Sequence, residues 1–515
     1  MQGIINNEII YEERYWEVLV MRISEKLGLS MSPYEMDFLD VDIEKDSELY
    51  IDPFLIANSN SQWAIQTDLV IKSFFNEFKL SMEQNDYERA KDLFAYMSEP
   101  KENCLGMSKK GTTNGRGVGE LNAQEIVDRI IKSNAIENNL VNNIEDLIIF
   151  VDDIDRDKLS DMVTNIIRKK LIEYTQQQCD FWNIPLTLSE TLPYWSAQDC
   201  TWMYSENERL LIIDNREILL VPKSIISPIN VYEGGKYKRH FVEEQEREFH
   251  LQRRSSLTRM RRLKNGSTRY YVLKRDVEND IKSKINNHEF ENNKDYLRKY
   301  TQQYPNLFSE FVKSSKGKIE SLSNEEIVKK LAELSIDDII DKMIFKLKHI
   351  PTGRKNATEF HYYVKALLEI LWYPYLVNPI VEREIHDGRK RIDITMDNND
   401  KGGFFYKLHD ISKIFCPYVY IECKNYGNDV ANPEIDQLAG RFSSGRGQFG
   451  LLICRDLNNK DLFVKRCQDT YRDGRGLILY LVDDDIIQML NAIHDEEPQR
   501  MWRLLEDKKR EVIIS

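Results

Sequence analysis

The sequence predicts an α/β protein with a mixed β-sheet flanked by helices in its C-terminal part and a separate N-terminal α/β region. Three observations support this prediction. Strand-like and helix-like segments alternate from residue 351 onward, which is the pattern of a sheet covered by helices on both faces. Residues 38–54 alternate between apolar and polar side chains, as strands do. A basic segment, residues 251–275, and a polar helical stretch separate the two regions.

The 515-residue chain has the composition of an ordinary folded protein, with 41% hydrophobic and 30% charged residues. We find no apolar run long enough to span a bilayer, and the acidic, polar start does not resemble a secretory signal. The seven cysteines form no Cys-x-x-Cys pair, which argues against a disulfide framework or a structural zinc site. We therefore expect a cytoplasmic protein that has no membrane partner.

The N-terminal domain is predicted to cover residues 1–225. Apolar residues recur at helical spacing over residues 11–28, and the strand candidates of residues 38–54 follow. Helices are expected after a glycine-rich loop, and residues 209–222 have the pattern of a hairpin.

The segment 251–275 contains many arginine and lysine residues and no acidic residue, although the whole chain carries a net charge of −13. Tyr270 and Tyr271 lie among these cations. Cations combined with aromatic rings suit a nucleic acid, whose phosphates attract charge and whose bases stack. The alternative is a solvated basic helix packed on an acidic neighbour. Residues 226–345 are predicted to form this basic segment and a helical connector, with nucleic-acid contacts from Arg253, Arg254, Arg261 and Arg262.

A further domain is predicted over residues 346–495, followed by a C-terminal tail at 496–515. A helix should begin near residue 356 and end at Tyr373, because apolar residues recur at helical spacing and Pro374 follows. Strands are predicted at 377–385, 390–397, 418–426, 448–455 and 476–482, and further helices at 433–442, 461–472 and 483–495.

Two short motifs in this domain contain the residue types that phosphodiester cleavage needs. Asp393 lies in Arg-Ile-Asp-Ile, and Glu422 and Lys424 lie in Glu-Cys-Lys at the end of an apolar strand. Because side chains alternate across a strand, Glu422 and Lys424 share one face and Cys423 points to the other. Carboxylates are ligands that Mg²⁺ prefers, and a lysine can assist proton removal from water. The motifs therefore indicate metal-dependent hydrolysis.

This arrangement resembles the PD-(D/E)xK superfamily of restriction-endonuclease-like nucleases, and the resemblance covers about 140 residues. It implies that the mixed sheet has the restriction-endonuclease-like fold. It also implies that Asp393, Glu422 and the carbonyl group of Cys423 bind Mg²⁺, for which Mn²⁺ can substitute, and that Lys424 acts on the attacking water. Asp393 is not preceded by proline, which departs from the motif.

The resemblance extends to two further positions. Some relatives carry a glutamate on the first helix, where Glu359 lies here, and a glutamine on the helix after the Glu-x-Lys strand, where Gln437 lies. Both are candidate catalytic residues. The alternatives are that Glu359 only favours the start of its helix and that Gln437 is an ordinary helix residue.

Arginines flank these motifs and are candidates for binding DNA phosphates, because the guanidinium group suits bidentate contact. The alternative is that they only keep the surface soluble. The candidates are Arg389, Arg391, Arg441 and Arg446.

The resemblance implies a Mg²⁺-dependent endonuclease that cleaves DNA. A nuclease fused to a large N-terminal region also resembles prokaryotic restriction and anti-phage defence effectors, which implies that residues 1–225 sense a trigger or build an assembly. A second copy of the chain or another defence protein would then be the partner. Two alternatives stay open: an enzyme that cuts RNA or a special DNA structure, and a non-catalytic binding or scaffold module on the nuclease fold.

Overall fold

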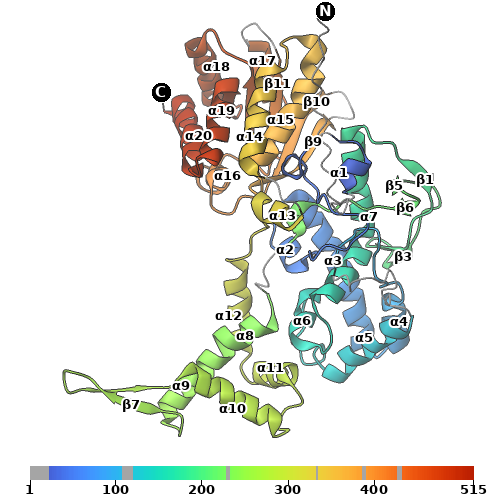
Figure 1. Ribbon diagram of the computed structural model, residues 1–515, viewed down its shortest axis with the longest axis vertical. Helices are drawn as coiled ribbons and strands as arrows, with labels where there is room; N and C mark the ends of the chain where they lie inside the picture. The colour runs from blue at the N-terminus through green and yellow to red at the C-terminus, as the bar shows by residue number, and fades with distance from the viewer. Residues whose placement is uncertain are drawn as a thin grey trace, which may run out of the picture.

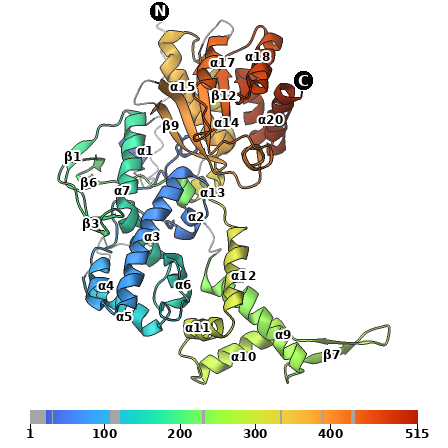
Figure 2. The same ribbon diagram turned by 180° about the vertical axis from the view of Figure 1, so that it is seen from behind.

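The computed structural model of the chain describes residues 22–29, 31–106, 120–227, 232–331, 335–385, 390–425 and 432–514. It has three parts, which Figures 1 and 2 show from opposite sides: a C-terminal domain built on a β-sheet, a mainly helical N-terminal domain beside it, and an arm of helices that ends in a two-stranded ribbon. Each domain has its own hydrophobic core, and the base of the arm shares the N-terminal core. The protein is therefore mixed α/β.

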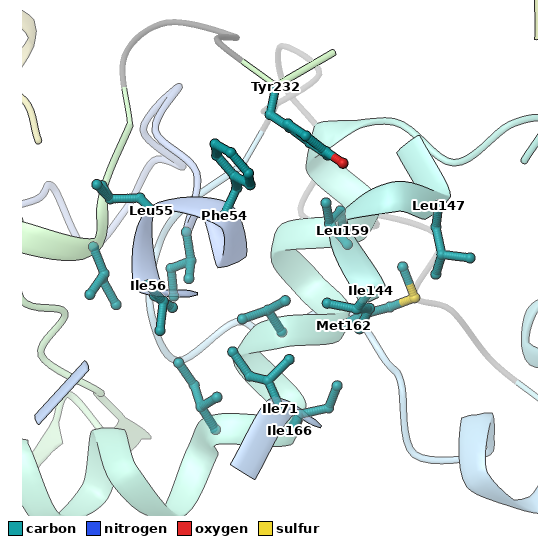
Figure 3. Packing of buried hydrophobic residues seen from close by; sticks show 14 of the residues in the cluster. Phe54, Leu55, Ile56, Ile71, Ile144, Leu147, Leu159, Met162, Ile166 and Tyr232 are labelled. Carbon is teal, nitrogen blue, oxygen red and sulfur yellow. The ribbon is translucent and has the colours of Figure 1, made fainter. Parts of the chain in front are cut away.

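Two long helices form the centre of the N-terminal domain, α3 (Gln62–Glu83) and α7 (Arg156–Trp182). Figure 3 shows side chains of α2, α3 and α7 packed together, with the ring of Phe54 next to that of Tyr232. Those two rings are stacked with their centroids 4.1 Å apart. The other helices of this domain are α1 (Ile23–Lys26), α2 (Pro53–Ala57), α4 (Tyr87–Phe94), α5 (Glu120–Ser133) and α6 (Leu147–Phe150).

The strands of the N-terminal domain are short and form three two-stranded pairs. One of them, β5 with β6, confirms part of the hairpin predicted at 209–222, because Asp214 and Asn215 adopt the positive φ angles of a tight hairpin turn. The pairs are β1 (Thr187–Ser189) with β4 (Glu208–Leu210), β2 (Tyr194–Ser196) with β3 (Thr201–Met203), and β5 (Ile212–Ile213) with β6 (Arg216–Glu217).

The strands predicted at 38–54 are wrong. Before α2 begins, this segment forms four isolated bridges in the described structure and no strand. They join Phe38 to Pro222, Asp42 to Arg22, Ser47 to Leu105 and Ile51 to Ile226. Residues 36–41 are buried without alternation, so both sides of the extended chain pack into the N-terminal core. The alternation in sequence therefore did not reflect a half-buried sheet. Most of the helix predicted at 11–28 lies outside the described residues.

The arm consists of α8 (Gly234–Tyr237), α9 (Glu243–Arg253), α10 (Lys274–Asn286), α11 (Asn293–Gln303) and α12 (Pro305–Lys316). Between α9 and α10 the chain forms a ribbon of two antiparallel strands, β7 (Arg259–Arg262) and β8 (Thr268–Tyr271). The predicted basic segment is thus a hairpin at its centre. Aromatic rings hold the base of the arm together, among them Tyr237, Phe308 and Phe311.

The C-terminal domain has the predicted five strands within a residue or two of their expected bounds, in the order β13-β12-β11-β10-β9. The sheet is mixed. β10 pairs antiparallel with both β9 and β11, whereas β12 pairs parallel with both β11 and β13. Helices cover both faces (Figures 1 and 2). The strands are β9 (Leu376–Ile385), β10 (Lys390–Asn398), β11 (Tyr418–Lys424), β12 (Phe449–Cys454) and β13 (Leu477–Val482).

The helices of this domain are α13 (Asn324–Leu331), α14 (Ile336–His349), α15 (Ala357–Trp372), α16 (Phe404–Tyr406), α17 (Asn432–Ala439), α18 (Lys460–Arg472), α19 (Asp483–His494) and α20 (Pro498–Ile513). Close packing of the segment that contains α17 depends on Gly450 in β12. A Cβ atom there would lie 3.0 Å from the ring of Phe442 and 3.1 Å from Leu438.

The structure differs from the predicted boundaries at both ends of the C-terminal domain. Residues 496–515 are not a tail, because α20 buries Met501, Leu505 and Val512 in the second core. At the other end, residues 336–345 of α14 were assigned to the connector, but Ile340 and Met343 are buried in the same core. Both helices are amphipathic, and each buries its apolar side against the sheet domain.

All seven cysteines are free thiols in the structure. Among the described helices, none combines the length and the apolar composition that a bilayer-spanning helix needs.

The two domains meet where α3 begins. Asp397 of β10 accepts hydrogen bonds from the hydroxyl group of Ser61 (2.8 Å), the backbone N–H of Trp63 (3.1 Å) and the side-chain amide of Asn378 (3.2 Å). A carboxylate from one domain therefore satisfies a free N–H group at the start of a helix in the other.

We expect Asp397→Ala to lower the free energy of unfolding by about 1–3 kcal/mol, because it leaves buried donors without their acceptor. Urea unfolding followed by tryptophan fluorescence measures this loss. Asp397→Asn keeps an acceptor oxygen and should lose less than half as much. Equal losses in both variants would contradict the capping role.

Candidate active site

The antiparallel pairing of β10 with β11 brings the two predicted acidic residues together. Ile394 is the register partner of Ile421, so Asp393 and Glu422 are the next residues along the same pair of strands. The apolar run that precedes Glu422 takes the strand into the sheet interior between β10 and β12, and Glu422 is completely buried. Residues far apart in sequence thus form one acidic cluster.

Glu422 is the centre of this cluster. Its Oε1 atom lies 2.8 Å from the Lys424 ammonium group and accepts a hydrogen bond of 2.6 Å from the side-chain amide of Gln437 on α17. Its Oε2 atom is buried and has no hydrogen-bond partner among the described residues. The structure therefore brings together Glu422, Lys424 and Gln437 and leaves one carboxylate oxygen available for a ligand.

The electrostatics of the cluster favour a bound cation. Burial raises the pKa of Glu422, and the neighbouring charge of Asp393 raises it further, whereas Lys424 and Arg441 lower it. Two carboxylates held this close repel each other unless a positive charge lies between them. A divalent cation would provide that charge.

Asp393 is held by the backbone of the neighbouring strand. Its Oδ2 atom accepts a hydrogen bond of 2.9 Å from the N–H group of Cys423. The imidazole Nε2 atom of His361, on α15, lies 3.1 Å from the carbonyl oxygen of Cys423 and 3.8 Å from Oδ2 of Asp393. His361 therefore contacts two of the three groups that the sequence predicted as metal ligands.

Sequence reasoning missed His361 and selected Glu359 from the same helix. Glu359 is exposed, and its carboxylate accepts a hydrogen bond of 3.3 Å from the Asn356 side chain at the start of the helix. The structure does not bring it into the cluster, which fits the alternative of a helix-start acid. The sequence did contain a signal that His361 faces the domain interior. Val364 and Leu368 are apolar, and they lie on the same side of the helix because they follow His361 by three and seven residues.

The predicted phosphate-binding arginines lie in different places. Arg441 is buried and close enough to Glu422 to lower its pKa. Arg446 is partly exposed, in a turn whose backbone accepts a hydrogen bond from Tyr420. Arg389 and the side chain of Arg391 lie outside the described residues. The other four candidates, Arg253, Arg254, Arg261 and Arg262, lie on the arm.

Arg455, at the end of β12, fixes the chain on either side of the site. Its guanidinium group donates to the carbonyl oxygens of Leu347 (3.0 Å) and Ile350 (2.8 Å) and to the side chain of Asn425 (3.1 Å). Asn425 directly follows Lys424, and its side chain donates to the carbonyl oxygen of Gly353 (3.1 Å). The end of β11 is thereby tied to the segment that leads into α15.

The helix that carries His361 also contacts the N-terminal domain. Lys365 and Glu369, one and two turns later, are completely buried, with 3.8 Å between the ammonium nitrogen and Oε1. The Lys365 ammonium group lies over the rings of Phe181 and Trp182 of α7, at 4.9 and 5.0 Å from their centroids. Any shift of α7 would therefore act on α15.

Two further buried groups complete this charged interface. Lys223 donates a hydrogen bond of 2.9 Å to Asn324, and Asp37 accepts one of 2.6 Å from the hydroxyl group of Tyr174. Burial lowers the pKa of Lys223 to about 8 and raises that of Glu369 to about 8. We define Asp37, Lys223, Lys365 and Glu369 as the buried interdomain cluster.

A family model matches most of the N-terminal domain. Residues 28–233 match a family model described as a domain of unknown function, DUF8370. No curated protein and no solved structure matches the chain. The chemistry of the C-terminal domain is therefore argued from its own residues.

The cluster fits a hard cation such as Mg²⁺. Among the described residues, no group of three His, Cys, Asp or Glu side chains is placed to hold a metal ion alone. The site instead offers two carboxylates and the Cys423 carbonyl group, and Mg²⁺ typically takes few protein oxygens and keeps several waters. The unpaired Oε2 atom of Glu422 supports this fit.

Proposed function

We propose that the C-terminal domain is a Mg²⁺-dependent endonuclease of the PD-(D/E)xK type that cleaves DNA. One observation carries the proposal: Asp393 and Glu422 lie next to each other on adjacent strands, with Lys424 bonded to Glu422 and the second oxygen of Glu422 unpaired. The pairing of the sheet also supports a restriction-endonuclease-like arrangement. β11 pairs antiparallel with β10 on one side and parallel with β12 on the other.

Each residue of the cluster has a role in this proposal. Asp393, Glu422 and the Cys423 carbonyl group would hold the metal, which stabilises negative charge on the phosphate and favours ionisation of a bound water. Lys424 orients the attacking water and stabilises the charge that develops in the transition state. Gln437 fixes the carboxylate of Glu422 by its hydrogen bond. His361 orients the Cys423 carbonyl group and the Asp393 carboxylate from α15.

We further propose that the N-terminal domain regulates this activity in an anti-phage defence or restriction effector, in response to a trigger or to assembly with another chain. Its support is the contact of α7 with α15, the helix that carries His361. A regulatory domain acts by biasing an element that the active site shares, and α15 is such an element.

The test is a cleavage assay with supercoiled plasmid, single-stranded DNA and RNA, each in Mg²⁺, Mn²⁺ or EDTA. Glu422→Gln, purified in the same way, controls for contaminating nucleases. We expect nicking of the plasmid by the wild-type chain in Mg²⁺ and in Mn²⁺, and none in EDTA. Preferential cutting of RNA would favour the RNA nuclease. Absence of cutting on every substrate, with and without partner proteins, would favour the scaffold module.

We expect His361→Ala to raise the Mg²⁺ concentration that gives half-maximal nicking by about tenfold or more, because residues that orient metal ligands typically contribute that much. Nicking rates measured across a Mg²⁺ titration give this value. His494→Ala, an exposed histidine on α19, is the matched control. An unchanged Mg²⁺ dependence in His361→Ala would remove His361 from the site.

A further inference from the structure

The ribbon formed by β7 and β8 is an exposed cationic feature of the described structure. All residues from Arg259 to Tyr270 are exposed, including Met260, of which 74% is accessible. The ribbon leaves the arm at the end of the molecule that lies away from the C-terminal sheet, and both views agree on this (Figures 1 and 2).

Strand pairing places cations on both faces. Arg261 pairs with Arg269, and Arg259 with Tyr271, so these side chains share one face. Met260 pairs with Tyr270, and Arg262 with Thr268, which gives the opposite face one arginine and an apolar patch. Lys264 lies in the turn. Cations therefore surround the outer half of the ribbon.

This arrangement is unfavourable for the isolated protein. Arg261 and Arg269 lie directly opposite each other. Like charges in this position destabilise an antiparallel pair of strands. A lone two-stranded hairpin is at best marginally stable. In the described part of the chain, only the base of the ribbon is fixed: Arg259 bonds to Asp276 at 2.6 Å, and Arg254 lies 4.6 Å from the ring centroid of Tyr270. The outer cations have no acidic partner there.

We infer that the β7–β8 ribbon enters the major groove of duplex DNA and contacts the phosphates on either side with Arg261, Arg262, Lys264 and Arg269. A surface that packs on one partner needs cations on one face, whereas a body that lies between two phosphate backbones needs them on both. The major groove of B-form DNA is about 12 Å wide and admits a two-stranded ribbon. The deep, narrow major groove of A-form RNA does not.

The inference deepens the proposed function, on which it rests for the identity of the polyanion as DNA. It assigns DNA binding to an element remote from the cleavage site, so the enzyme holds its substrate at two places. Arg261, Arg262 and the turn act on the backbone, and they give affinity without sequence information.

The experiment measures binding of the full chain to a fluorescein-labelled duplex by anisotropy, in EDTA, over a series of KCl concentrations. We expect Arg261→Ala/Arg269→Ala to weaken binding about tenfold or more near 100 mM salt, and to reduce the slope of log K against log salt by about two, because two phosphate contacts are lost. Arg261→Lys/Arg269→Lys keeps both charges and should keep the slope.

The matched control is Lys282→Ala/Lys284→Ala on α10, which removes two cations that are already paired with Glu278 and Asp280. Its affinity should stay within about twofold of the wild type. Unchanged affinity and slope in Arg261→Ala/Arg269→Ala would overturn the inference. So would duplex RNA or polyglutamate that competes as well as duplex DNA at equal charge.

The failures of this inference and of the proposed function are distinguishable. Binding in EDTA needs no cleavage, so a ribbon-dependent affinity without nicking would keep the ribbon assignment and refute the nuclease. If the chain nicks DNA but its affinity for DNA does not depend on Arg261 and Arg269, the nuclease proposal stands and the ribbon assignment is refuted.

Discussion

Replacing Lys424 by alanine should lower the rate of plasmid nicking at least about 100-fold, which is the usual contribution of one positioned proton-transfer or charge-stabilising group. Lys424 bonds to Glu422 at 2.8 Å, and its charge lowers the pKa of that carboxyl group. Its removal takes away the group that acts on the attacking water. Rates are measured under single-turnover conditions in saturating Mg²⁺.

Two kinds of control show that a loss of nicking comes from the missing Lys424 side chain. Circular dichroism shows whether the variant is folded, and its DNA binding in EDTA should match the wild type, since Lys424 lies on β11 and not on the ribbon. Lys465→Ala, an exposed position on α18, removes the same charge and should leave the rate unchanged. Wild-type nicking by Lys424→Ala would remove the catalytic assignment of the Glu-x-Lys motif.

Replacing Lys365 by methionine should lower the free energy of unfolding by about 3–5 kcal/mol at pH 9, because it leaves a buried charge without its partner. Glu369 is completely buried beside Lys365. Burial raises the pKa of Glu369 to about 8, so this acid is protonated in the folded protein at pH 6 and ionised at pH 9. The loss should therefore be smaller at pH 6.

The direction in which stability changes with pH follows from proton binding by Glu369. The folded protein holds the Glu369 proton between about pH 4.5 and pH 8, whereas the unfolded chain has released it, so this group's contribution to stability falls as pH rises through that range. Without Lys365 the pKa of Glu369 rises further, and the fall extends above pH 8. Asp37 faces the same cluster and raises the pKa of Glu369, whereas Lys223 lowers it.

Urea unfolding at pH 6 and pH 9, followed by tryptophan fluorescence, measures both losses. Lys365→Met/Glu369→Leu removes the unpaired acid together with the cation, and it should recover most of the stability. Lys329→Met makes the same substitution at an exposed position of α13 and is the control. A loss below about 1 kcal/mol at pH 9 would contradict a charged interdomain cluster.

Local patterns in the sequence were sufficient to predict the five strands of the C-terminal domain and its helices α15, α17, α18 and α19. Its strands are apolar runs bounded by polar or turn residues, and its helices repeat apolar residues every three or four positions, so each signal lies within a single element. The shared face of Glu422 and Lys424 follows in the same way from strand geometry. Their contact at 2.8 Å agrees with it.

Predictions that depend on non-local pairing were less successful. The alternation at 38–54 suggested strands, but the segment forms only isolated bridges in the described structure, and its first residues, 38–41, are buried without alternation. The basic segment forms a hairpin because Arg259 to Arg262 pair with Thr268 to Tyr271, which its charge pattern did not indicate. The amphipathic pattern of α20 was present, but only the sheet domain shows what covers it.

The sequence by itself determined which residue types are available for phosphodiester chemistry and on which strands they lie, because strand and helix periodicity are properties of short segments. Only the tertiary structure decided that His361 rather than Glu359 faces the cluster, that Asp393 lies next to Glu422, and that the helix carrying His361 is held by a charged interface with the N-terminal domain. The physical reason is that register, helix rotation and buried ion pairs are set by contacts between segments far apart in the chain.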